Sequence, residues 1–388
     1  MHATADTTAV KFRQRLGAAR DARRGAAAFD VSMKDIFLKR ALTVALLLFV
    51  GVVASFARGS ESRKLFPVVR NKKWGFIDVK GQTVIPLQFD YARDFSEGLA
   101  AAGAGDKWGY IDETGRWAIE PKYESALPFS EGLAQVRVGG QWSSEPVYLI
   151  GGKTSYIDRT GKVVFTLPDS PLGTSYDDYT FSEGLLPLAL SRDKYGYVDK
   201  TGRMAIEPKF DYAGDFSEGL AGVWVGDFIG FIDRTGKFAI KPKFPIAGWG
   251  RPNSFSEGLV TVPVGEMMGF VDKTGKIVIA PRFYRADSFS EGLAAVQLTE
   301  RENLDGYIDK TGKIIIKPQF EIGGHFREGL AAVRINGKWG YIDKSGKVVI
   351  QPQFSEAQWF SGGLAQVRVG GRLGYINAAG SYVWRPTN

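Results

Sequence analysis

From residue 65 onward, short stretches of alternating apolar and polar residues are separated by glycine-containing turns. In the clearest copy, residues 329–354, the pattern predicts three strands over residues 331–336, 339–343 and 347–350. Pro352 is expected to end the ladder, because proline has no N–H to offer a further strand. Every stretch with helical spacing is interrupted by Gly or Pro, so the repeats predict an all-β fold.

The unit recurs along the chain with a spacing of 34 residues in its shortest copies, and two markers define it. The first marker is an aspartate at the end of the second strand, replaced by asparagine in the last copy. These residues are Asp78, Asp112, Asp158, Asp199, Asp233, Asp272, Asp309, Asp343 and Asn377. The second is the motif Phe-Ser-Glu-Gly-Leu or a close variant. Its glycines are Gly98, Gly132, Gly184, Gly219, Gly258, Gly292, Gly329 and Gly363.

Nine copies predict a tandem array of nine three-stranded β-meander repeats, either a superhelical solenoid or a closed propeller-like ring. Nine units exceed the usual number of propeller blades, which favours the open array. Recurrent phenylalanines, such as Phe95 and Phe289, are expected to join each unit to the next, because one meander cannot bury enough apolar area alone.

The recurrent aspartates are predicted to be structural turn residues. Each lies a few residues before a glycine, where its carboxylate can accept a hydrogen bond from the backbone of the turn. The alternative is a ladder of metal-binding or catalytic carboxylates, which would require charge. Asn377 keeps the acceptor without the charge and therefore favours the turn. The motif glycines predict positive φ or a close approach of another backbone segment. The glutamates before them are expected to form hydrogen bonds to loop backbone, with catalysis as the less favoured alternative.

The N-terminal region has a different character from the repeats. Residues 41–57 are apolar, follow Lys39 and Arg40, and end in small residues typical of a cleavage site. We expect residues 1–32 to be a basic tail or a mis-assigned start, with Met33 as an alternative initiator. Residues 33–57 are expected to be a signal peptide or a signal anchor, and 65–388 the repeat domain. The repeats would then lie outside the cytoplasm, secreted, periplasmic or tethered to the inner membrane. A buried helix is the alternative.

Composition narrows the possible functions. The chain has no cysteine, which excludes disulfides and thiolate chemistry. The net charge of +8 is concentrated in the first 57 residues; the remaining residues hold 41 basic and 38 acidic side chains. This near balance of positive and negative charges argues against nucleic-acid binding.

Residues 74–78, 108–112 and 339–343 each read Trp-Gly-aromatic-Ile-Asp and are followed by a glycine turn. Together with the Phe-Ser-Glu-Gly-Leu marker, they resemble the WG (or KWG) repeat family of bacterial proteins over residues 65–388. The resemblance implies a β-repeat array, often in exported proteins, and no common catalytic residues. The third unit departs from it, since Thr154-Ser155 replace Trp-Gly.

Two insertions are the candidate ligand-binding loops, because insertions often carry the sites of repeat proteins. The third unit is lengthened at residues 139–154 and 168–180, and another insertion spans residues 245–253. Their aromatic and charged residues could hold a sugar or a basic peptide; the alternative is plain surface loops. These residues are Trp142, Tyr148, Tyr176, Asp177, Asp178, Tyr179, Trp249 and Arg251.

Enzymatic function is not expected. The repeats contain one histidine, His325, and neither a nucleophile elbow nor a phosphate-binding glycine loop. We therefore expect no catalytic residues, metal or cofactor, and a scaffold that binds a protein partner. Carbohydrate or cell-wall binding through exposed aromatic residues is the second hypothesis. Glycoside hydrolysis by a carboxylate pair is the third and the least favoured.

Overall fold

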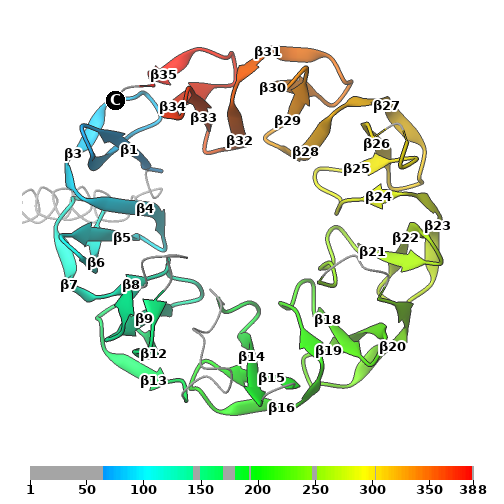
Figure 1. Ribbon diagram of the computed structural model, residues 1–388, viewed down its shortest axis with the longest axis horizontal. Helices are drawn as coiled ribbons and strands as arrows, with labels where there is room; N and C mark the ends of the chain where they lie inside the picture. The colour runs from blue at the N-terminus through cyan, green and yellow to red at the C-terminus, as the bar shows by residue number, and fades with distance from the viewer. Residues whose placement is uncertain are drawn as a thin grey trace, which may run out of the picture. The chain divides into compact units, whose positions relative to one another are not determined.

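The computed structural model describes residues 64–142, 149–168, 180–191, 194–246, 251–301 and 303–386, which form a ring of nine β-sheet blades (Figure 1). Within these ranges, no helix has the length and apolar character needed to cross a membrane. The predicted tail at 1–32 and the predicted signal segment at 33–57 lie outside the described residues.

The blades follow one another in chain order. Blades 1 to 4 consist of β1 (Phe66–Arg70), β2 (Lys73–Ile77) and β3 (Thr83–Phe89); β4 (Tyr91–Ser96), β5 (Leu99–Ala104), β6 (Lys107–Asp112) and β7 (Trp117–Tyr123); β8 (Ser125–Ala126), β9 (Ala134–Val138), β12 (Lys153–Ile157) and β13 (Val163–Thr166); and β14 (Leu185–Ser191), β15 (Lys194–Asp199) and β16 (Met204–Phe210). In blade 3, the insertion forms the hairpin β10 (Gln141–Trp142) and β11 (Leu149–Ile150).

Blades 5 to 9 continue the series. They consist of β17 (Tyr212–Ala213), β18 (Leu220–Val225), β19 (Phe228–Asp233) and β20 (Phe238–Pro245); β21 (Leu259–Val264), β22 (Met267–Asp272) and β23 (Ile277–Phe283); β24 (Arg285–Ala286), β25 (Leu293–Gln297), β26 (Asp305–Asp309) and β27 (Ile314–Phe320); β28 (Ile322–Arg327), β29 (Leu330–Ile335), β30 (Lys338–Asp343) and β31 (Val348–Phe354); and β32 (Glu356–Ser361), β33 (Leu364–Val369), β34 (Arg372–Asn377) and β35 (Tyr382–Trp384).

Most blades have one strand more than the three that the alternation predicts. In blade 2 the extra strand is β4, which pairs with β5 and lies nearest the centre of the ring, whereas β7 lies at the rim (Figure 1). β4 consists of residues that the sequence marks only as the approach to a Glu-Gly turn. The inner strand escaped prediction because it is short, only two residues in β8, and is interrupted by a bulge in β4.

The outer strand also differs from expectation at its proline. Pro352 was expected to end the ladder, but β31 continues through it to Phe354. β31 is the outermost strand of its blade, so no further strand needs the N–H that proline lacks. The opposing Gly340 lies at the bulge, where an added Cβ would come within 2.5 Å of the Ile350 carbonyl oxygen. This close approach explains why the Trp-Gly pair keeps its glycine more strictly than its tryptophan.

Among the described residues, blades 1, 4 and 6 have three strands, and each carries a proline in its innermost strand. The prolines are Pro67 in β1, Pro187 in β14 and Pro263 in β21. At the position of blade 7 that matches Pro67 and Pro187, the Ala295 carbonyl accepts a hydrogen bond from the Asp287 N–H next to the inner strand. The Gln297 carbonyl, which matches Pro263, accepts one from the Tyr284 N–H. In an antiparallel strand, the N–H and the carbonyl of one residue point toward the same neighbouring strand. A proline at either position therefore lacks the N–H that an additional inner strand would accept a hydrogen bond from.

The core is divided among the interfaces between blades. Each interface has its own cluster of buried residues; for example, Tyr110 and Ile119 of blade 2 pack with Phe129 and Val136 of blade 3. The motif phenylalanine of each blade meets an aromatic ring of the previous one, as Phe289 meets Phe270 at 4.9 Å between centroids. The expectation that these phenylalanines join neighbouring units is confirmed.

The ring is closed, so the preference for an open array was wrong. Blade 9 packs against blade 1 through a ninth cluster that unites Phe66 and Val68 with Leu364 and Tyr375. The Tyr375 hydroxyl donates to the Pro67 carbonyl at 3.0 Å, and its ring meets Phe66 edge-on. Closure buries apolar surface that an open array would leave exposed at both ends.

Candidate interaction face

One face of the ring is built from two kinds of turn, and we term it the turn face. In blade 2, Leu99 pairs with Asp112. The turn before Leu99 and the turn after Asp112 therefore lie at the same end of the blade. The first is a two-residue Glu-Gly turn and the second is the aspartate turn. Both turns recur from blade to blade.

The Glu-Gly turn has positive φ at both residues, which is the type I′ hairpin geometry. Glu257 has a φ of 54° and Gly258 a φ of 86°. The predicted positive φ of the motif glycines is confirmed, but that of the glutamates was not foreseen. A non-glycine residue rarely adopts this conformation, so the glutamate must be held there by contacts elsewhere.

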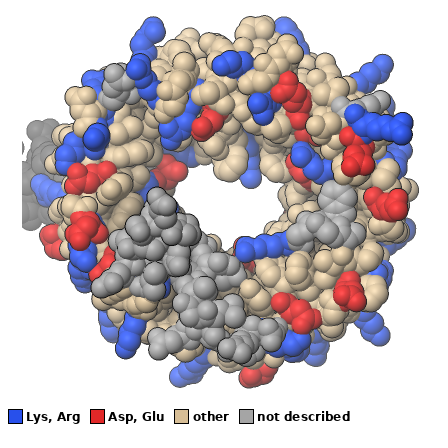
Figure 2. Space-filling model, in the orientation of Figure 1, with Lys and Arg blue, Asp and Glu red and all other residues tan. Residues whose placement is uncertain are grey.

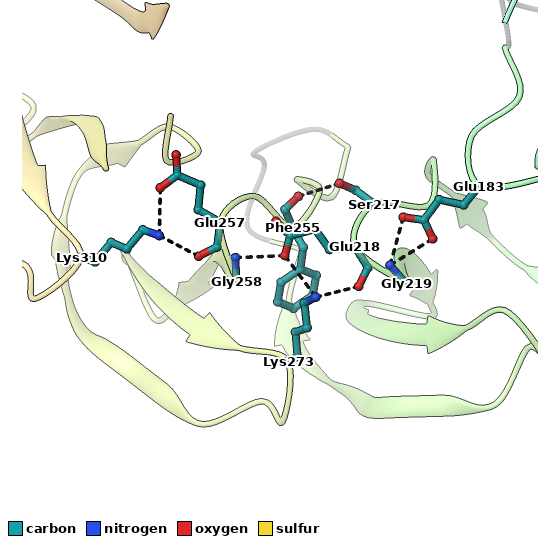
Figure 3. Close-up of polar contacts among 9 residues, drawn as sticks. All are labelled: Glu183, Ser217, Glu218, Gly219, Phe255, Glu257, Gly258, Lys273 and Lys310. Carbon is teal, nitrogen blue, oxygen red and sulfur yellow. Dashed lines mark hydrogen bonds and ion pairs between the residues drawn. The ribbon is translucent and has the colours of Figure 1, made fainter. Parts of the chain in front are cut away.

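Those contacts reach into the next blade (Figure 3). The Ser217 hydroxyl donates to the Phe255 carbonyl at 2.7 Å, and the Glu218 carboxylate accepts from the Gly258 N–H at 3.0 Å. Lys273 donates to the carbonyl oxygen of Glu218 at 2.8 Å and pairs with its carboxylate at 3.2 Å. We term this set of bonds the inter-blade latch.

The latch repeats along the ring. The same glutamate-to-glycine bond joins Glu97 to Gly132, Glu131 to Gly184, Glu183 to Gly219, Glu257 to Gly292, Glu291 to Gly329 and Glu328 to Gly363. In blade 9 the glutamate is replaced by Gly362, so the latch ends where the ring closes. The prediction that these glutamates bond loop backbone is confirmed, with the detail that the backbone belongs to the neighbouring blade.

The latch changes the electrostatics of its carboxylates. Partial desolvation acts to raise the pKa of Glu257, but the bonds from Lys310 and the Gly292 N–H outweigh it and hold the pKa below the ordinary value. The Lys310 ammonium lies 2.9 Å from the carboxylate. Glu291, with Lys344, is affected in the same way. These glutamates are therefore ionised and already paired at neutral pH.

The aspartate turns lie beside the latch. The Asp343 carboxylate accepts hydrogen bonds from the Ser345 hydroxyl at 2.6 Å and from the N–H groups of Ser345 and Lys347 at 2.9 and 3.1 Å. The bond from the Ser345 hydroxyl is the largest influence and lowers the pKa of Asp343. Asn377 accepts the equivalent backbone bonds from Ala379 and Ser381. The same pattern occurs at Asp78, Asp112, Asp158, Asp199, Asp233, Asp272 and Asp309.

The opposite face has its own bonds between blades. Asp90, between blades 1 and 2, pairs with Lys73 at 2.6 Å and accepts from the Gly105 N–H at 2.8 Å. Glu124 does the same with Lys107 and Gly139. Carboxylates on both faces therefore hold blades together. In the part of the chain that the structure describes, no group of His, Cys, Asp or Glu is arranged to hold a metal ion.

The structure describes little of the predicted ligand-binding set. Tyr148, Tyr176, Asp177, Asp178, Tyr179 and Trp249 lie outside the described residues, and of Trp142 only the backbone, at the end of β10, is described. The Arg251 guanidinium lies over the Tyr212 ring, 5.5 Å from its centroid, at the inner strand of blade 5. Ligand binding by these residues remains a prediction.

A surface feature that sequence reasoning missed lies at the start of the outer strands. The first two residues of these strands are apolar in most blades, and nine of them are between 40 and 50% exposed. We term them the outer belt: Val163, Val164, Met204, Phe238, Ile277, Val278, Ile314, Ile315 and Val349. Consecutive apolar residues at the start of an edge strand could have revealed the belt, because one of each pair must face away from the core.

The ring defines the class of the protein as a nine-bladed β-propeller of short antiparallel meanders. The sequence profile described as WG containing repeat matches residues 74–108, 108–142, 195–227, 229–262, 268–300, 306–339 and 339–372. These matches span more than half of the chain, which therefore belongs to the WG repeat family. Each matched segment starts in the strand next to the outermost strand of one blade and ends in the next blade, as residues 74–108 run from β2 to β6.

Solved structures show a similar fold at low sequence identity. A crystal structure of the eukaryotic initiation factor aligns with a TM-score of 0.58 at 10% identity, covering 82% of this chain and 95% of that chain. BamB from Moraxella catarrhalis aligns at 0.41 and 11% identity, covering 81% and 92%. The dihydro-heme d1 dehydrogenase NirN aligns at 0.45 and 13% identity, covering 83% and 77%. No curated protein matches the sequence.

Proposed function

We propose that this chain is a non-enzymatic scaffold whose outer belt binds a protein partner outside the cytoplasm. The observation that carries the proposal is the repetition of exposed apolar pairs along consecutive blades. The belt residues recur in blades 3 to 8, and exposed apolar side chains that gather on a surface are typical of interaction sites.

The chemistry beside the belt indicates what kind of partner it fits. A basic residue immediately precedes the apolar pair in blades 2 to 8. These residues are Arg116, Lys162, Arg203, Lys237, Lys276, Lys313 and Lys347, and all are exposed. Lysine and arginine side chains project from the rim around the ring (Figure 2). The belt therefore fits a segment that carries acidic residues beside apolar ones.

The recurrent pairing of the turn-face carboxylates supports a non-enzymatic role within the described residues. Glu257 and Glu291 are each committed to a lysine and to a backbone N–H, and the turn aspartates are committed to their own turns. A general acid or base needs a proton that it can exchange with substrate. The N-terminal apolar segment, with Lys39 and Arg40 before it, supports a location outside the cytoplasm.

Site-specific photo-crosslinking in cells tests this proposal. A benzophenone amino acid at Ile315 should yield a discrete crosslinked partner, because this side chain lies in the belt and is 40% exposed. The same probe at Asp106, an exposed turn residue at the opposite end of blade 2, is the control and should not capture that partner.

The crosslink should depend on the basic residues if the partner has the proposed chemistry. Exchanging Lys276, Lys313 and Lys347 for glutamate should reduce the yield at Ile315 at least tenfold, and the captured protein should present an acidic-apolar segment. A crosslink that survives charge reversal, or equal capture at Asp106, would contradict the proposal.

A further inference from the structure

The closure of the ring leaves a hollow at the seam between blade 9 and blade 1. Blade 1 has β1 as its innermost strand, whereas its neighbours carry the additional inner strands β4 and β32. A cavity of about 400 Å³ lies between these two strands. It is lined by Lys64, Asp94, Gln358, Trp359, Gln366 and Tyr375, among others, and we term it the seam cavity.

The seam cavity lies where an inner strand of blade 1 would be. Between blades 2 and 3, the Tyr110 hydroxyl donates to the Leu127 carbonyl, directly after the inner strand β8. At the seam, the corresponding Tyr375 hydroxyl donates to Pro67 of β1 instead. The aromatic contact is kept by Phe66, and both Phe66 and Tyr375 line the cavity.

The polar side chains that line the cavity form few hydrogen bonds with the rest of the protein. Within the described ranges, the side chains of Asp94 and Gln358 make no hydrogen bond to the rest of the protein. Gln366 accepts only a long bond, 3.4 Å, from the Tyr375 hydroxyl. Desolvation in the wall of the ring raises the pKa of Asp94, and the charge of Lys64 acts in the opposite direction. Lys64 itself donates to the Ser361 hydroxyl.

One large aromatic ring is presented beside these groups. Trp359 is 55% exposed, the most exposed large apolar side chain that the structure describes, although it belongs to an inner strand. It immediately precedes the motif phenylalanine, as Asp94 does in blade 2. The other side chains at this repeat position are small or polar, such as Ser254, Ser288 and His325. A tryptophan here contributes nothing to the core, since the core position is Phe360.

We propose that the seam cavity binds a neutral saccharide, with one sugar ring stacked on Trp359 and its hydroxyls bonded by Asp94, Gln358 and Gln366. The face of an indole attracts the C–H face of a sugar, and carboxylate and amide groups supply the mixed acceptors and donors that hydroxyls require. Lys64 and Asp94 carry opposite charges, so the cavity favours no net charge on its ligand. The volume admits one or two sugar rings.

Titration calorimetry and saturation-transfer NMR on the full chain test this site. The probes are cellotetraose and tetra-N-acetylchitotetraose, which present plain and N-acetylated neutral sugars. At least one should bind, with saturation transfer concentrated on the C–H groups of a single sugar ring. Trp359→Ala and Asp94→Asn should each weaken that binding at least tenfold.

The control variant is Phe228→Ala, which removes an exposed aromatic residue, 46% exposed, from another blade. It should bind the saccharide like the unaltered chain. Thermal melts establish that all variants are folded. Absence of binding to both probes at millimolar concentration would overturn the proposal, as would binding that Trp359→Ala and Asp94→Asn leave intact. The outer belt is untouched by these changes, so partner capture at Ile315 is a separate result.

Discussion

The residues that recur most regularly in this chain are acidic, and they differ in which backbone groups they bind. Asp343 bonds the backbone of its own turn, whereas Glu257 bonds the backbone of the next blade. Exchange for an uncharged residue is tolerated at the first position when the acceptor is kept, as Asn377 shows. At the second position, glycine appears only in the last blade, beside the seam.

The turn aspartates should make the ring sensitive to acid. Hydrogen bonds, first among them that of Ser345, hold the pKa of Asp343 below its ordinary value of 3.8. A carboxyl with a lowered pKa in the folded state contributes stability above its unfolded pKa, and this contribution is lost as the pH falls through the folded value. We expect melting temperatures that vary little between neutral pH and about pH 5 and that fall below about pH 4.

Asparagine at Asp233, Asp272, Asp309 and Asp343 should flatten this acid decline, because the amide oxygen still accepts the backbone bonds. Melting temperatures across the pH range provide the measurement. Alanine at the same four positions serves as the control and should lower the melting temperature at every pH. An asparagine variant that declines with acid as steeply as the natural chain would refute the assignment.

Substitutions of a latch glutamate should lower the free energy of unfolding by an amount that depends on how many of its bonds are lost. Glu257→Gln keeps an acceptor for the Gly292 N–H but loses the ion pair with Lys310, and should cost less than about 1 kcal/mol. Glu257→Ala loses both and should cost about 1–2 kcal/mol. Urea unfolding measures both values. Glu266→Ala, at an exposed turn between β21 and β22, should have no effect; equal losses for all three variants would contradict the latch.

At the scale of the element, alternation predicted three strands of each blade and the turn that follows the second. It did so because these strands are five to eight residues long in most blades and their glycine turns are local features. The inner strand could not be found in this way, since β17 and β24 contain only two residues and gain their partners from the blade. The latch was equally hidden, because its bonds join residues about one repeat apart.

The prolines of the three-stranded blades lead to a prediction about the inner strand. Ala332 in β29 occupies the position that Pro67 and Pro187 hold in their blades. Ala332→Pro should remove a donor facing β28 and lower stability by roughly 3 kcal/mol. Hydrogen exchange should show lost protection in β28, while β30 and β31 stay protected. Pro187→Ala is the control and should change stability by less than about 1 kcal/mol; unaltered protection of β28 would exclude this role for proline.

At the scale of the whole molecule, nine similar interfaces form a ring, but one of them joins blades that are distant in sequence. Eight interfaces connect consecutive blades, so a broken contact can reform while the chain holds its partners close. The seam joins blade 9 to blade 1 through side chains such as Phe66 and Tyr375, and in the described chain no strand is exchanged across it. Sequence alone could not distinguish closure from an open array, because closure depends on the small rotation between successive blades.

The seam should therefore be the first interface to open. Phe66→Ala removes a buried ring that meets Tyr375 at 5.5 Å, and Phe289→Ala removes one that meets Phe270 at 4.9 Å. Each should cost about 3–5 kcal/mol of contact energy. In the seam variant this loss should open the ring without unfolding its blades, because each blade keeps one neighbour. Small-angle scattering should then show a larger radius of gyration for Phe66→Ala only, with protection from hydrogen exchange lost first in blades 1 and 9. If Phe289→Ala opens the ring as readily, or if Phe66→Ala unfolds all nine blades together, closure is as cooperative as the other interfaces and the seam has no special weakness.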